Sequence, residues 1–303
     1  METLHDLGAG PGRPHRKSAN VVEQLYATHG IGPRYGYETL CALAAPWLVH
    51  LRLVDFHGNL GGPGDNDRAA NPRYTEVRLS QAGARAVAAE RGDGPRLPIG
   101  LINGDLAAGG SAPPFDPASV VRAMEGAAGA AGVSDAELAE LVGPPSFPTA
   151  CSVDADLGLV WAGERTSARL SAHVDIEPHG RATELVISRL PFGIGVDAIG
   201  SAIASRVDRG SDRLHQSHPA LHARLGIPIT DIRDESTSDT VRLTCVVAPD
   251  ADPDLCRERI LETWPVTTEV PIRLAQPIPT LVRAYLDNPA TQLAALRALI
   301  ADA

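Results

Sequence analysis

The residue pair with the clearest chemical potential is Arg73–Tyr74, within the stretch AANPRYTEVRLS. A tyrosine oxygen can attack a phosphodiester only where the negative charge of the phosphate is neutralised. Arginine suits that purpose because its guanidinium is always charged and presents a fork of N–H donors to phosphate oxygens. Taken alone, the pair also fits a tyrosine that packs at the start of a strand beside an exposed arginine. The pair by itself therefore leaves both interpretations open.

The sequence around the pair predicts short helices and strands in a regular order. Apolar spacing and turn residues indicate a helix over 18–30 capped by Ser18, a helix over 37–48 ending near Pro46, strands over 50–56 and 73–80, and a helix over 80–91. A Gly-, Asn- and Asp-rich loop over 58–72 separates the two strands. Two helices followed by a strand pair around a loop is the pattern of a winged helix, a module that presents a helix and a wing to a DNA duplex.

A second region follows a Gly/Pro-rich seam over 92–117. Its expected elements are strands over 168–178 and 182–191 joined by a hairpin at 179–181, a helix over 197–207, a strand over 241–249, and a helix over 252–264 with Asp252 at its start. The last segment, 278–303, is expected to be helical with an interruption at Pro289. We therefore predict an α+β protein with domains at 1–95, 96–278 and 279–303.

Composition limits the class of protein. The 303 residues carry a formal net charge of −10, which disfavours a free-standing nucleic-acid binder judged on total charge, although local patches can still be basic. The four cysteines form no Cys-x-x-Cys pair, so we expect reduced thiols in a cytoplasmic protein. No targeting segment and no stretch of about 20 apolar residues is seen, so no membrane partner is expected.

Seven short motifs, in order, resemble the A subunit of DNA gyrase and topoisomerase IV, the bacterial type II topoisomerases. They are RKSANVV (16–22), LRLVDFHGNLGGPGD (51–65), RYTEVRLS (73–80), LPIGLINGD (97–105), VGPPSFPTA (142–150), LPFGI (190–194) and IRDEST (232–237). Each motif is weak alone, but together they extend over nearly the whole chain. The resemblance implies a winged-helix breakage–reunion domain over 1–95, a tower-like α+β domain over 96–278, and the start of a coiled-coil helix over 279–303.

The resemblance also implies roles for individual residues. Tyr74 would attack DNA and form a 5′-phosphotyrosyl link, Arg73 would stabilise the scissile phosphate, and His29 would flank the DNA backbone, although His29 also fits an inert position at a helix C-terminus. The implied DNA-binding residues are Arg16, Lys17, Arg34 and Leu106. Arg16 and Lys17 also fit a solvated basic pair, and Leu106, the candidate wedge between base steps, also fits simple loop packing.

The implied partners are double-stranded DNA, a gyrase B-type subunit, and a second copy of the chain in a homodimer associated with the nucleoid. Mg²⁺ and ATP would be supplied through the B-type subunit, and we assign neither to this chain. Glycine-rich stretches at 7–12 and 193–200 lack the spacing of a nucleotide loop. His215, His218 and His222 have a spacing that could bind zinc, but Pro219 lies between them and no cysteine or acidic ligand is interleaved, so no metal site is assigned.

The sequence departs from the family pattern at several positions. Ile31 replaces the second of two family histidines, the family arm before Met1 is missing, the chain ends where the coiled coil would begin, and the loop around Leu106 is contracted. Arg34 stands where the family usually has serine, four residues before Glu38, and we expect it to repel the metal through which fluoroquinolones bind. These departures leave two rivals to an enzyme: a DNA- or gyrase-binding regulator, decoy or drug-resistance factor, and a degenerate paralogue or gene fragment.

Overall fold

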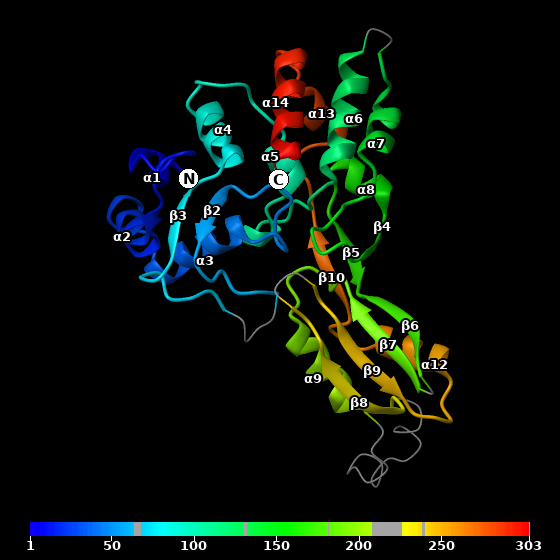
Figure 1. Ribbon diagram of the computed structural model, residues 1–303. Helices are drawn as coiled ribbons and strands as arrows, with labels where there is room; N and C mark the ends of the chain where they lie inside the picture. Colours follow the sequence, from blue (N-terminus) through cyan, green and yellow to red (C-terminus); the bar gives the residue numbers. More distant parts are fainter. Residues whose placement is uncertain (64–67, 130–131, 181, 208–225, 238–239, 303) are drawn as a thin grey trace.

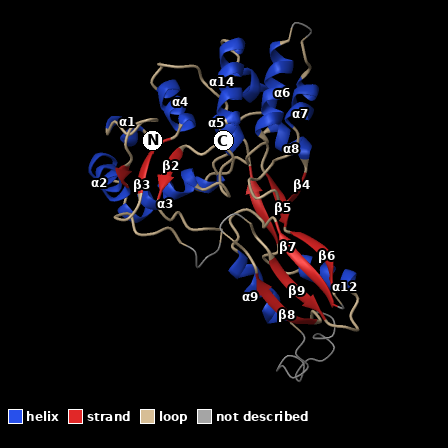
Figure 2. Ribbon diagram, viewed as in Figure 1, coloured by secondary structure: helices blue, strands red, loops and turns tan. Residues whose placement is uncertain are grey.

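The computed structural model describes residues 1–63, 68–129, 132–180, 182–207, 226–237 and 240–302 and has a mixed α+β fold, as the sequence predicts (Figure 1). Strands in these ranges form three small antiparallel sheets: β1 (Arg16–Lys17), β3 (Glu76–Leu79) and β2 (Val54–His57); β10 (Thr267–Ile272), β5 (Thr166–Ser171) and β4 (Ser152–Ala155); and β6 (His173–His179), β7 (Ala182–Ser188), β9 (Leu243–Val247) and β8 (Ile229–Asp234). Figure 2 shows helices beside each sheet, with α9 (Val196–Arg206) and α12 (Pro253–Leu261) next to the sheet β6-β7-β9-β8.

The helices of the described residues are mostly short. They are α1 (Glu2–Asp6), α2 (Ser18–His29), α3 (Pro33–Ala44), α4 (Gln81–Glu90), α5 (Ile99–Asn103), the 3-10 helix η1 (Leu106–Ala108), α6 (Pro117–Ala128), α7 (Asp135–Val142), α8 (Leu157–Ala162), α9 (Val196–Arg206), α12 (Pro253–Leu261), α13 (Ile278–Arg283) and α14 (Pro289–Ala301). None of those in the described part of the chain is long and apolar enough to cross a membrane.

The N-terminal elements largely follow the predicted order. Helix α2 ends at Gly30, whose left-handed backbone (φ 68°) stops the helix, as expected. The next helix was predicted too late in the chain: α3 begins at Pro33 and ends at Ala44. Proline at the first helical position lacks only an N–H that would be unpaired there. The two predicted strands are confirmed in shorter form, as β2 and β3.

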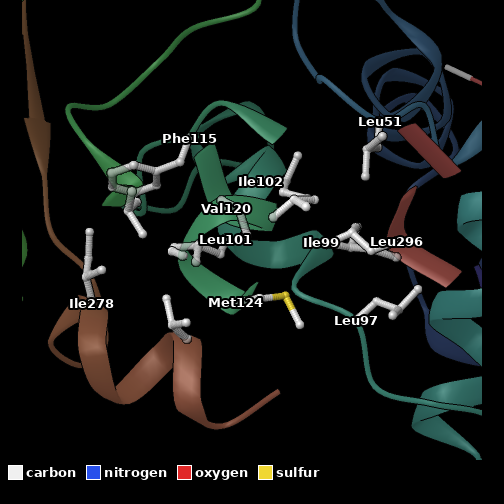
Figure 3. Close-up of a cluster of buried hydrophobic side chains, with 14 of the residues drawn as sticks. Leu51, Leu97, Ile99, Leu101, Ile102, Phe115, Val120, Met124, Ile278 and Leu296 are labelled. Atoms are coloured by element: carbon white, nitrogen blue, oxygen red, sulfur yellow. The ribbon is translucent and has the colours of Figure 1, made fainter. Parts of the chain in front are cut away.

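Three clusters of buried apolar side chains hold the fold together. The first packs α1, α2, α3 and α4 around the sheet β1-β3-β2, with Val22, Leu40, Val77 and Val87 among its buried residues. The second lies among α5, α6, α13 and α14 and joins them to β5 and β10 (Figure 3). The third fills the space between one face of the sheet β6-β7-β9-β8 and the helices α9 and α12.

A buried amide joins α5 to the segment that precedes β2. The Nδ2 of Asn103 donates to the backbone oxygen of Leu51, and its Oδ1 accepts from the Leu51 N–H, both at 2.8 Å. Asn103 is 7% exposed, so both of its polar groups need partners inside the protein. The asparagine of the motif LPIGLINGD thus makes both hydrogen bonds with the backbone of one residue, Leu51, like the paired bonds between two β-strands.

The second half of the chain brings the main corrections. The predicted strand over 168–178 is two strands. The strand is interrupted at Ala172, where the chain passes from the sheet β10-β5-β4 to the sheet β6-β7-β9-β8. The hairpin between β6 and β7 is confirmed by the pairing of His179 with Ala182, while Arg181 lies outside the described residues. The seam over 92–117 contains α5 and η1. Helices α6, α7 and α8 were not expected from the sequence. The predicted domain limits remain predictions.

Candidate active site

Tyr74 lies on an exposed turn that precedes β3. The turn spans Pro72–Tyr74 and closes with a hydrogen bond from the Tyr74 N–H to the backbone oxygen of Asn71 (2.8 Å). The strand begins two residues later, at Glu76, so the expectation of a strand from residue 73 is wrong at its first three positions. Tyr74 is 69% exposed. Its hydroxyl is therefore open to solvent, as attack on an external phosphodiester requires.

The turn is fastened to the first residues of α2. The Ala19 N–H donates to the Pro72 oxygen (3.1 Å), and the Ser18 N–H donates to the Thr75 oxygen (3.0 Å). The Thr75 hydroxyl donates to Ser18 Oγ at 2.8 Å, and both residues are fully buried. Ser18 was expected to cap α2, but Lys17 is the cap residue and the Ser18 hydroxyl holds the tyrosine turn instead.

Tyr37 of α3 fixes the other side of the turn. Its hydroxyl donates to the Ala70 oxygen and lies 3.0 Å from Thr75 Oγ1. Burial raises the pKa of Tyr37, and the hydrogen bond to Thr75 offsets only part of this rise. Tyr37 therefore stays a neutral donor at physiological pH.

Gly58 allows the loop after β2 to run close to the turn. Its φ is 115°, and a Cβ added there would lie 3.2 Å from Thr75 Cγ2 and 3.4 Å from the backbone oxygen of Tyr74. Both the backbone conformation and the close approach favour glycine at this position. Gly58 therefore contributes to the position of Tyr74, since any larger residue there would press on the turn.

Arg73 lies against the ring of Tyr74. The guanidinium carbon is 5.3 Å from the ring centroid, within the range of a cation–π contact. The backbone N–H and Nε of Arg73 both donate to Asn71 Oδ1 at 3.2 Å. A charged fork of donors and an exposed phenol thus share one turn, which is the arrangement that attack on a phosphate requires.

Lys17 and Arg16, predicted to bind DNA, precede α2 as strand β1 and are both exposed. Lys17 Nζ contacts Glu76 Oε1 at 2.8 Å, and His57 Nδ1 lies 3.6 Å from Glu76 Oε2. The hydrogen bond from Lys17, then its charge, lower the pKa of Glu76. The Arg16 Nη2 donates to the Leu7 oxygen at 2.9 Å. Both cations therefore flank the start of α2, on the same side as the turn.

The other predicted site residues lie apart from Tyr74. His29 is the exposed last residue of α2. The turn that carries Tyr74 is fastened to the first residues of this helix, which is roughly 16 Å long, so His29 and Tyr74 of the same chain lie apart. Arg34 Nε contacts Glu38 Oε1 at 2.8 Å on the exposed side of α3, and this hydrogen bond raises the pKa of Arg34. Leu106 is half-buried in η1 and packs against the second cluster of core residues.

Sequence reasoning missed the residues that support the turn, namely Asn71, Thr75 and Tyr37. The Asn71–Pro72 dipeptide is a turn signal that could have found the first of them. The described residues include no group of three His, Cys, Asp or Glu side chains placed to hold a metal ion. His215, His218 and His222 lie outside the described residues.

Comparison with known proteins identifies relatives of this sequence. A profile for the A subunit of DNA gyrase/topoisomerase IV matches residues 3–93. The DNA gyrase A subunit of Halalkalibacterium halodurans is 27% identical over 300 residues, covering 90% of this chain and 34% of the relative. The DNA topoisomerase 4 A subunit of Synechocystis is 28% identical over 300 residues, covering 88% and 31%. The DNA gyrase A subunit of Mycobacterium bovis is 32% identical over 240 residues, covering 69% and 28%.

These relatives share one type of subunit, and the similarity extends over most of this chain. The chain belongs to the family of DNA gyrase and topoisomerase IV A subunits. It spans about a third of the length of the curated relatives that it matches.

Proposed function

We propose that this chain is the DNA breakage–reunion part of a type II topoisomerase A subunit, with Tyr74 as its nucleophile. The observation that supports this most directly is the exposed Arg73–Tyr74 turn, fastened to the start of α2 in a chain of this family. We further infer that β1, α2, α3, β2 and β3 form a winged helix that presents the turn to a DNA duplex. The tower-like domain over 96–278 and the coiled-coil start over 279–303 are inferred from the resemblance to the gyrase and topoisomerase IV A subunits.

The proposed reaction exchanges one phosphodiester for another. The Tyr74 hydroxyl loses its proton and its oxygen attacks phosphorus, the bond to the 3′ oxygen breaks, and that oxygen takes up a proton, so no proton is gained or lost overall. The DNA 5′ phosphate is then esterified to the tyrosine, so its bond energy is retained, and attack by the 3′ hydroxyl reverses the step. Arg73 would stabilise the extra negative charge that develops on the phosphate oxygens.

A B-type partner subunit completes the proposal. Magnesium would assist phosphoryl transfer by stabilising charge on the phosphate oxygens. From the family of this chain, we assign the magnesium and ATP sites to the partner and derive no step through them. A homodimer would place two Tyr74 side chains on the two strands of one duplex. A cytoplasmic, nucleoid-associated location follows from this role.

The test is a cleavage-trapping assay. The protein is mixed with supercoiled plasmid, magnesium and a gyrase-type B subunit, and the reaction is stopped with detergent and digested with protease. We expect linear or nicked DNA with the wild type and with Tyr35→Phe, a matched control because Tyr35 is also exposed (59%), but none with Tyr74→Phe. Equal cleavage by Tyr74→Phe and the wild type would overturn the proposed nucleophile.

A second candidate is a catalytically weak paralogue that binds DNA or gyrase subunits as a regulator, decoy or drug-resistance factor. It is favoured by the position of His29, which lies at the far end of α2 from Tyr74. Absence of cleavage by the wild type, together with retained binding of DNA or of gyrase subunits, would support this candidate over the enzyme.

A further inference from the structure

Resting on the function proposed above, we propose that Asn71 is a positioning residue, which orients the Arg73 guanidinium so that its outer edge meets the scissile phosphate. The juxtaposition that supports this is a single side-chain oxygen between two donors of the same arginine. Asn71 Oδ1 accepts from the backbone N–H of Arg73 and from its Nε, both at 3.2 Å. The backbone and the guanidinium of Arg73 are thereby fixed relative to each other.

The edge of the guanidinium that Asn71 leaves open is the one that phosphate needs. An arginine has five N–H donors, one on Nε and four on the two Nη atoms. Among the described residues, the hydrogen bonds of Arg73 involve its backbone N–H and its Nε, and none involves an Nη atom. Both Nη groups therefore remain able to donate to two oxygens of one phosphate, the bidentate geometry that arginine prefers.

The neutrality of Asn71 matters as much as its position. Two cations on the adjacent sheet have carboxylate partners: Lys17 contacts Glu76 at 2.8 Å, and Arg78 contacts Asp55 at 2.6 Å. A carboxylate at position 71 would offset the charge that the phosphate is meant to meet. An amide oxygen orients the guanidinium and leaves its charge uncompensated.

The turn does not depend on the Asn71 side chain. Backbone donors from Ser18 and Ala19, and side-chain bonds of Thr75 and Tyr37, hold the segment on both sides of Arg73. Removing the Asn71 amide should therefore release the Arg73 side chain while the backbone of the turn stays in place. This separation of the two effects makes the inference testable by substitution.

The first measurement is single-turnover cleavage at saturating DNA by Asn71→Ala. We expect the rate to fall on the order of tenfold or more, because a small displacement of a charged donor greatly weakens its effect on the reacting phosphate. We expect the Kd for DNA and the Tm to stay close to wild type. Asn59→Ala is the matched control, since Asn59 Oδ1 makes a similar bond to the Gly61 N–H (2.7 Å) without touching Arg73. The control should cleave at the wild-type rate.

The second measurement separates positioning from a structural role. In the Arg73→Ala background, Asn71→Ala should cause no further loss, since a residue that acts through Arg73 has nothing left to orient. A further loss of the same size as in the wild type would overturn the inference, and so would an unchanged rate for Asn71→Ala alone. If the wild type shows no cleavage that depends on Tyr74, the proposed function itself fails, and this inference fails with it.

Discussion

Arg73 of the N-terminal turn and the arginines of the four-stranded sheet β6-β7-β9-β8 have different contacts. Arg73 is held by the neutral amide of Asn71 and leaves both Nη groups without a hydrogen bond to a described residue. On the open face of the four-stranded sheet, carboxylates surround the arginines. Arg233 contacts Glu184, Asp231 and Glu235, and Arg242 contacts Glu177 and Glu235.

An arginine can bind a phosphate only where carboxylates do not already occupy it, so the contacts of each arginine matter more than the number of arginines. Glu184 is 4% exposed, so its charge is taken out of water and requires Arg233. Arg233 and Arg242 hold their sheet together, whereas Arg73 stabilises nothing in the fold that a neutral residue could not. The net charge of −10 hides this distinction because it sums over both regions.

The largest expected effect comes from removing the available arginine. Arg73→Ala should lower the rate of DNA cleavage about 100- to 1000-fold, the usual cost of losing one preorganised donor to a transition state. Its Tm should stay near wild type because Arg73 is exposed. Single-turnover cleavage and a thermal melt measure the two. A large drop in Tm would show that Arg73 belongs with the structural arginines.

Arg233→Ala should have the opposite profile. Among the described residues, it leaves the buried carboxylate of Glu184 with His179, whose Nδ1 lies 3.8 Å away. We expect a loss of roughly 2–3 kcal/mol in the free energy of unfolding, measured by urea denaturation. Arg257→Ala, which removes an exposed pair with Asp254, is the control and should cost less than about 1 kcal/mol. Equal losses for the two variants would contradict the structural role of Arg233.

Asn71→Asp gives Arg73 a carboxylate partner, like those of the arginines on the four-stranded sheet. Aspartate can still accept from Arg73, but its charge offsets the guanidinium. We expect cleavage to fall about tenfold, with a Kd for DNA that rises less steeply with salt than that of Asn71→Ala, because one fewer cation neutralises a phosphate. Wild-type cleavage by Asn71→Asp would show that the neutrality of this position is unimportant.

Acid should loosen the four-stranded sheet before the three-stranded sheet β1-β3-β2. A hydrogen bond from Arg242 lowers the pKa of Glu177, and hydrogen bonds from Thr244 and then Arg242 lower that of Glu235. A carboxyl group with a lowered folded pKa contributes stability above its unfolded value of 4.5, and this is lost as the pH falls through the folded pKa. The sheet β1-β3-β2 has one such group, Glu76. Amide hydrogen exchange between pH 5 and 3, with Glu177→Gln as the control, measures the order.

The smallest expected effect on the fold is at Arg34, whose partner Glu38 is also exposed. Arg34→Ser should leave the Tm unchanged, because exposed pairs contribute little. If the chain cleaves DNA, Arg34→Ser should strengthen fluoroquinolone-stabilised cleavage, since the positive charge that repels the bound metal is gone. Normal drug sensitivity of the wild type would contradict the expectation.

Local signals in the sequence predicted much of the fold. Helix α2 with Gly30 at its end, the β6–β7 hairpin, and α12 with Asp252 as its cap all follow from residues close together in the chain. The break at Ala172 was not predictable in this way. Strands β5 and β6 read as one continuous alternating run, and only their partners, β10 and β7, place them in different sheets.

The family of the chain and the Arg73–Tyr74 pair could be found from the sequence, because ordered motifs and adjacent residue types are properties of the chain alone. Which charges are available depends on the folded structure. Arg73 and its partner Asn71 are 2 residues apart in the sequence. Arg78 and Asp55 are 23 residues apart, and Arg233 and Glu184 are 49 residues apart. Folding selects these contacts because a buried carboxylate such as Glu184 requires a partner, while the exposed Nη groups of Arg73 can remain in water.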